Sequence, residues 1–179
     1  MYSKFRIIPL CLAAVALLTA SPTLARDKDS VFFESVAGLW KGPGEIVAGK
    51  YKGTKFVCNL SGDPVEGKAT GISLDGHCRV GVFNQKMSAV ITRKGSNYTG
   101  SFLDGSAGDG LDIVSGKITG DRAVMAINRK TLNGAMIARL HDTETMNVTI
   151  SVKVGKEMVP VIGMTLKRKA EAIKTGSLR

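Results

Sequence analysis

The chain has 179 residues and a formal net charge of +10, with 44% hydrophobic and 22% charged residues. It is long enough to bury the core of one domain, and its excess of cations favours anionic partners such as lipid headgroups or acidic polymers. The basic residues are spread along the sequence without interleaved aromatic residues, which argues against nucleic acid as a partner.

The first residues have the organisation of a Sec-type signal peptide. Lys4 and Arg6 precede an apolar core over residues 7–18, and Thr23-Leu24-Ala25 supplies small residues for cleavage. The core is too short for a spanning helix, and no later run approaches the ~18 apolar residues that one needs. We therefore expect a signal peptide over residues 1–25 and cleavage near Ala25. The mature domain would be periplasmic or secreted and would not span the membrane.

A short helix is expected over residues 29–37, with Ser30 as its N-cap and Phe32, Phe33 and Val36 on its apolar side. From Leu39 the hydrophobic period changes to two, which is typical of strands. Turn-forming pairs such as Asp75-Gly76 separate the runs. We predict strands at 39–47, 54–60, 69–74, 78–83, 87–93, 98–103, 112–118, 123–129, 134–140, 146–154 and 158–168.

Strand starts at intervals of about 8 to 12 residues indicate an all-β fold, not βαβ units. We predict an antiparallel up-and-down β-barrel of roughly eight to eleven strands, with a β-sandwich as the alternative. Residues 26–168 form the single barrel domain, and the basic residues 169–179 form a flexible tail. Pro160 cannot donate to a ladder, so we expect it at a bulge or an unpaired edge.

Two cysteines remain once Cys11 leaves with the signal peptide. Cys58 and Cys78 are an even pair in an oxidising compartment, which predicts one disulfide that would stabilise the fold by roughly 3 kcal/mol. The alternative is a catalytic or metal-binding thiol pair. No Cys-x-x-Cys spacing supports that alternative.

The helix followed by Gly38-Leu39-Trp40 resembles the opening of calycin-type barrels, the lipocalin group and its relatives. The resemblance implies that Trp40 closes one end of the barrel and that a basic residue of the last strand stacks on it. Arg168 is the candidate for that stacking, with Lys167 as a substitute. The alternative is that Trp40 is a large core residue that happens to follow Gly-x.

Adding the cysteines gives a second resemblance. Gly38-Leu39-Trp40, Cys58-Asn59-Leu60 and Gly76-His77-Cys78 together resemble small bacterial periplasmic inhibitors of metalloproteases, which are barrels with one disulfide. The similarity covers about the first third of the mature chain, and no inhibitory residues carry over. More broadly, the chain resembles small exported β-proteins of alphaproteobacteria.

Most of the methionines after Met1 lie on apolar faces of predicted strands. Methionine fills irregular gaps in cores, but it also makes a soft and adaptable lining for a lumen. A small barrel is either filled or just wide enough for one ligand. Both alternatives stay open, and the candidate lumen residues are Met125, Ile127, Met146, Val148, Ile150, Ile162 and Met164.

No catalytic, metal or cofactor motif stands out. His77 and His141 lack a metalloprotease spacing, and neither a Gly-x-Ser-x-Gly elbow nor a phosphate loop is present. We therefore expect a non-enzymatic protein without a cofactor that binds an apolar or amphipathic ligand, a lipid or other amphiphile with a preference for an anionic headgroup. One alternative is a protein-interaction module with an envelope protein partner, such as a protease inhibitor. Another is a structural envelope protein with a filled core.

Overall fold

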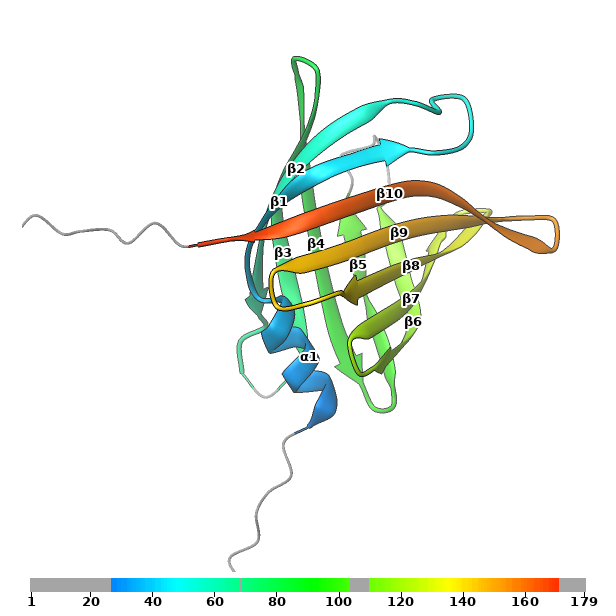
Figure 1. Ribbon diagram of the computed structural model, residues 1–179. Coiled ribbons are helices and arrows are strands. Elements are labelled where there is room, and N and C mark those ends of the chain that lie inside the picture. The colour runs from blue at the N-terminus through cyan, green and yellow to red at the C-terminus, as the bar shows by residue number, and fades with distance from the viewer. Residues whose placement is uncertain (1–26, 68, 104–109, 171–179) are drawn as a thin grey trace, which may run out of the picture.

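In the computed structural model, residues 27–67, 69–103 and 110–170 are described. They form a short helix followed by antiparallel strands that close into a barrel (Figure 1). The helix α1 spans Lys28–Val36. The described strands are β1 Gly38–Ile46, β2 Lys55–Pro64, β3 Gly71–Val80, β4 Phe83–Lys94, β5 Asn97–Leu103, β6 Leu111–Thr119, β7 Arg122–Arg129, β8 Leu132–Leu140, β9 Thr145–Val154 and β10 Glu157–Lys169.

The barrel has up-and-down topology. Each strand pairs antiparallel with the next one in the chain, and β1 pairs with β10 to complete the ring. Antiparallel neighbours need only short connections, and Gly95, Gly120 and Gly155 take positive φ angles of 64°, 58° and 60° in three of them. The predicted all-β barrel is confirmed. The β1–β10 pairing closes the sheet and excludes the sandwich.

Two predicted strands are one strand in the structure, because Asp75-Gly76 is not a turn. β3 runs straight through this pair, and Gly76 lies opposite Leu60 of β2 and Met87 of β4. A side chain at Gly76 would overlap the carbonyl oxygen of Asn59. The glycine is therefore there for close approach of neighbouring backbone, a role that a sequence pattern does not distinguish from a turn.

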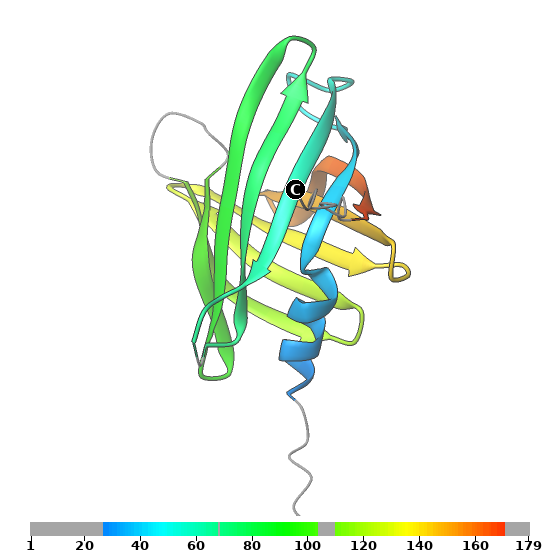
Figure 2. The ribbon, with the colours of Figure 1, turned by 90° about the vertical axis from the view of Figure 1, so that its left-hand side faces the viewer.

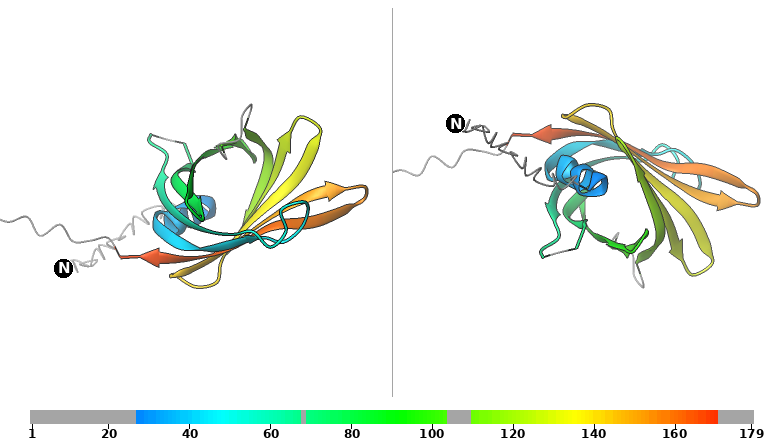
Figure 3. Two further views of the ribbon diagram at one scale, coloured as in Figure 1. Left: turned by 90° about the horizontal axis from the view of Figure 1, so that it is seen from above. Right: turned by 90° about the horizontal axis from the view of Figure 1, so that it is seen from below.

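The helix α1 lies against one end of the ring of strands (Figures 2 and 3). We call this the helix end, and it also carries the β4–β5, β6–β7 and β8–β9 connections. The β1–β2, β3–β4, β7–β8 and β9–β10 connections lie at the opposite end, which we call the far end. The predicted cap is wrong: Asp27, not Ser30, accepts a hydrogen bond from the backbone N–H of Asp29, at 3.3 Å.

The alternation of the strands buries one continuous apolar cluster inside the barrel. On β10 the alternation is interrupted, because the register against β9 shifts between Pro160 and Ile162. Pro160 thus lies at the expected bulge. The strand continues to Lys169, which pairs with Leu39, so the predicted tail begins one residue too early. The predicted signal peptide and residues 171–179 of the predicted tail lie outside the described residues. Within the described part of the chain, no helix is long and apolar enough to cross a membrane.

Candidate functional site

The helix end is closed by Trp40, whose side chain is 1% exposed. Its indole Nε1 donates a hydrogen bond of 2.9 Å to the carbonyl oxygen of Val36, the last residue of α1. The guanidinium of Arg168 lies over the same ring, with its central carbon 4.3 Å from the ring centroid. Arg168 reaches Trp40 because β10 pairs with β1 in a register that sets the two residues opposite each other.

The same guanidinium binds three backbone carbonyl groups. Arg168 donates hydrogen bonds to the carbonyl oxygens of Ser35 in the last turn of α1, of Ala37 just after it, and of Thr143 in the β8–β9 connection. Gly38 leaves room for it, since a side chain there would come within 2.9 Å of its Nη1, and the backbone of Gly38 has a φ of +106°. Gly38, Trp40 and Arg168 are therefore placed together at the helix end, as the calycin resemblance implies.

A polar cluster fixes the first turn of α1 to the barrel wall. The carboxylate of Asp27 forms an ion pair with the guanidinium of Arg93 on β4, at an N–O distance of 2.6 Å. The carboxylate of Asp29 accepts hydrogen bonds from Arg93 and from the hydroxyl of Tyr98. Burial alone raises the pKa of Asp27, but the Asp29 N–H and the Arg93 charge outweigh it and hold this pKa below its usual range. Burial, together with the bond to Asp29, raises the pKa of Tyr98.

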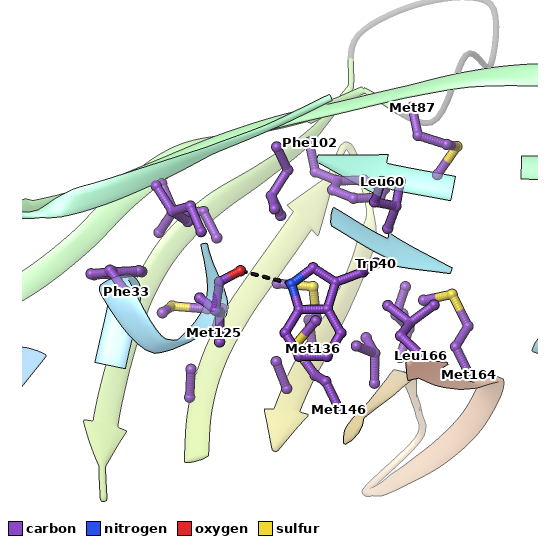
Figure 4. Close-up of a pocket in the computed structure, with 18 of the residues that line it drawn as sticks. Phe33, Trp40, Leu60, Met87, Phe102, Met125, Met136, Met146, Met164 and Leu166 are labelled. Carbon is purple, nitrogen blue, oxygen red and sulfur yellow. Dashed lines mark hydrogen bonds between the residues drawn. The ribbon is translucent and has the colours of Figure 1, made fainter. Parts of the chain in front are cut away.

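A cavity of about 100 Å³ lies inside the barrel behind this closure (Figure 4). The surface that the lining residues present to it is entirely apolar. Three of the lining residues come from α1, and the rest come from the strands. The lining consists of Phe32, Phe33, Val36, Trp40, Leu60, Ile72, Leu74, Cys78, Met87, Ser88, Ile91, Phe102, Ala123, Met125, Met136, Ala138, Met146, Val148, Ile150, Met164 and Leu166.

Five of the seven candidate lumen residues line this cavity: Met125, Met146, Val148, Ile150 and Met164. The other two lie beside it. Ile127 is buried in the core, where it packs under Gly134, and Ile162 is half-buried next to the β10 bulge. Both belong to the apolar interior without facing the empty space.

The sequence did not single out the lining residues of α1, β4 and β8. Met87 and Met136 stood among the noted methionines, and Ala138 follows Met136 at the strand period of two. That alternation was the signal that could have found them. The sequence does not predict that Phe32, Phe33 and Val36 line the cavity, because their position depends on how α1 packs against the barrel.

Cys58 and Cys78 form the predicted disulfide. The two residues lie directly opposite each other on β2 and β3, with a Cα–Cα distance of 4.0 Å, and Cys78 lines the cavity. The bridge uses both thiols, so neither is free as a nucleophile or metal ligand. In the described ranges, no group of three or more His, Cys, Asp or Glu side chains is placed to hold a metal ion.

Comparison with known proteins informs the fold alone. No protein-family model and no curated protein matches the sequence. Eleven chains of known structure match the fold, among them the crystal structure of Rv2717c from M. tuberculosis. That match has a TM-score of 0.53 and 12% sequence identity, and it covers 79% of this chain and 98% of Rv2717c. The two chains share a barrel architecture over nearly the whole of the smaller one.

Proposed function

We propose that this protein binds an amphipathic ligand of the cell envelope, with the ligand's apolar chain in the lumen and its anionic group toward the far end. The observation that carries the proposal is the cavity inside the barrel, whose walls are apolar. Water gains too few hydrogen bonds in such a space to occupy it, whereas an apolar group fills it favourably. Each buried methylene contributes ~0.8 kcal/mol of binding free energy.

The methionines support a ligand longer than the empty space itself. Met87, Met125, Met136, Met146 and Met164 all line the cavity. Methionine is unbranched and has several rotatable bonds, so its side chain can repack around an entering chain at small cost. We therefore infer that a medium-length acyl chain enters by displacing these side chains, not by filling a preformed tunnel.

The anionic group of the ligand is assigned to Arg129. This residue is half-buried at the far end of β7, and the alternation of β7 puts it on the same face as Met125 and Ile127. A guanidinium can bind a carboxylate or phosphate through two parallel N–H donors. The net charge of the chain, +10, attracts the same class of ligand from a distance.

Two observations support a location in the cell envelope. The first 25 residues have signal-peptide organisation, and the Cys58–Cys78 disulfide is of the kind that persists in oxidising compartments. The grouping of Gly38, Trp40 and Arg168 supports a relationship to calycin-type barrels, a group in which the lumen is the binding site. We include that relationship in the proposal.

Calorimetric titration with octanoate, decanoate and dodecanoate, each below its micelle concentration, tests the proposal. We expect saturable one-to-one binding whose affinity rises about fourfold per added methylene until the lumen is full. Arg129→Met should weaken dodecanoate binding while leaving the affinity for dodecanol unchanged.

Two alanines on β8 supply a matched pair of variants. Ala138 lines the cavity, whereas Ala135 is half-buried on the opposite face of the same strand. Ala138→Phe should abolish binding and Ala135→Phe should leave it intact. If the phenyl ring of Ala138→Phe disturbs folding, the smaller change Ala138→Leu tests the same blocking of the lumen. A barrel that binds none of the three fatty acids, or binds them equally after Ala138→Phe, would be a structural protein with a filled core.

A further inference from the structure

The far end of the barrel exposes large apolar side chains at the tips of its hairpins. Val82 and Phe83, in the β3–β4 hairpin, are 89% and 77% exposed, and Tyr51 in the β1–β2 hairpin is 63% exposed. Val154 and Met158 are likewise exposed in the β9–β10 hairpin. Folding gains nothing from apolar side chains in water, so their concentration at one end calls for a partner.

The helix end differs in this respect. Of the large hydrophobic residues that the structure shows exposed, only Val31 and Leu39 belong to it, and its β4–β5 and β6–β7 turns are built from Gly, Ser, Asn and Asp. Val90 and Val114 are exposed on the barrel wall, outside the hairpins of the far end. The apolar tips are therefore a property of the far end and not of the whole surface.

Cations surround these apolar tips. Residues 45–55, 79–86 and 153–158, which make up the three hairpins, contain two acids, Glu45 and Glu157. The same segments contain seven cations, all exposed: Lys50, Lys52, Lys55, Arg79, Lys86, Lys153 and Lys156. Each hairpin thus combines an apolar tip with basic flanks. Figure 1 shows the three hairpins extending from the barrel on the side away from α1.

We propose that these three hairpins dock the barrel on an anionic lipid surface. Apolar tips enter the boundary between headgroups and acyl chains, and lysines beside them meet the phosphates. The excess of exposed cations over acids in these segments makes an anionic surface the complementary partner. The docked barrel would point its far end, and with it Arg129, at the membrane.

This docking does not depend on the ligand proposed for the lumen. The residues that carry it lie on the outside of the hairpins, and none of Tyr51, Val82 and Phe83 lines the cavity. A variant with a blocked lumen, Ala138→Phe, should therefore bind vesicles as well as the wild type. Failure of fatty-acid binding together with intact vesicle binding would remove the first proposal and leave this one.

Co-sedimentation of the purified protein with vesicles tests the docking. We expect binding to vesicles of 30% phosphatidylglycerol in phosphatidylcholine, weakening as salt is raised, and little binding to phosphatidylcholine alone. The double variant Lys50→Glu/Lys52→Glu should lower the affinity about 30-fold or more. The matched control is Lys94→Glu/Lys117→Glu, with the same change of charge at exposed positions away from the hairpins, and it should change the affinity less than about threefold.

The apolar contribution has its own pair of variants. Val82→Ser/Phe83→Ser keeps the charge and should weaken binding at least tenfold, whereas Val90→Ser/Val114→Ser on the wall should leave it unchanged. Circular dichroism confirms that each variant is folded. Wild-type protein that stays in the supernatant with anionic vesicles overturns the proposal, and so does a loss of binding that is equal in the hairpin and control variants.

Discussion

The two ends of this barrel are built on opposite principles. At the helix end, Trp40 is buried and hydrogen-bonded, and Arg168 binds three backbone carbonyl groups beside it. At the far end, apolar side chains of similar size, such as Phe83 and Tyr51, stand in water. The difference indicates that one end holds the fold together and the other is available for contact with partners.

The energetic consequence is an uneven distribution of stability. Buried side chains with satisfied polar groups contribute most of the free energy of unfolding, while exposed residues contribute little. Substitutions of comparable size at the two ends should therefore differ by several kcal/mol in their effect on stability. Substitutions at the far end should weaken vesicle binding more than substitutions at the helix end do.

The largest expected effect is that of Trp40→Ala. It removes a fully buried indole and leaves the Val36 carbonyl without its donor, and we expect a loss of about 3–5 kcal/mol in the free energy of unfolding. Phe83→Ala at the far end should change it by less than about 0.5 kcal/mol. Urea unfolding of both variants measures the contrast, and equal losses would contradict it.

The disulfide comes next. Cys58→Ala/Cys78→Ala releases a constraint between residues 20 positions apart and should lower the stability by roughly 3 kcal/mol. Because the bridge lies in the wall between the two ends, vesicle binding by the folded variant should be unchanged. Thermal unfolding and co-sedimentation of the same sample check both statements.

Arg168→Met should cost about 2 kcal/mol, because it removes the stacking on Trp40 and the hydrogen bonds to Ser35, Ala37 and Thr143. Arg139→Met is the matched control. Arg139 pairs with Asp121 on the exposed surface, so its loss should cost less than about 1 kcal/mol. Chemical denaturation of the two variants measures whether Arg168 contributes more to the free energy of unfolding than Arg139 does.

Tyr98→Phe should lower the free energy of unfolding by about 1 kcal/mol at neutral pH, because it removes the hydrogen bond to Asp29. The pKa of Tyr98 is raised in the folded state, so its contribution is complete below pH ~10 and is lost as the pH rises above that value. The variant should therefore lose less stability than the wild type between pH 9 and 11. A pH series of urea unfolding curves gives this difference directly.

Asp27 gives the acid counterpart. Its pKa is lowered in the folded state, so its contribution is present above the ordinary value near 3.8 and is lost as the pH falls through the folded-state pKa. Asp27→Asn should flatten the acid limb of the stability curve below pH ~4 and leave the alkaline limb intact. A steeper acid limb in the variant would contradict the assignment.

The sequence predicted the repetitive parts of the fold well. Period-two alternation located the strands, and even the bulge at Pro160 followed from the missing N–H of proline. Gly76 misled because a glycine that admits a neighbouring backbone looks the same in sequence as one that makes a turn. The cap of α1 was misplaced by three residues because Asp27 and Ser30 are both good cap residues, and the contact with Arg93 decides between them.

The candidate site was less accessible to sequence reasoning. Trp40 and Arg168 are far apart in the chain, and a family resemblance, not their local pattern, brought them together. The cavity depends on how α1 docks and on which methionines leave space between them, and neither is encoded in a local pattern. Tyr51 and Gly155 fall between predicted strands, but Val82 and Phe83 lie inside the predicted strand 78–83, whereas the structure ends β3 at Val80. The exposure of these tips is a property of the closed barrel.

The most direct test of the central claim uses the single tryptophan. Trp40 is the only one in the chain and it lines the cavity, so its fluorescence reports on a ligand inside the lumen. Dodecanoic acid brominated along its chain should quench this fluorescence saturably, with the quenching lost in Ala138→Phe and kept in Ala135→Phe. Quenching that is absent, or that survives Ala138→Phe, would show that the apolar chain does not enter the barrel.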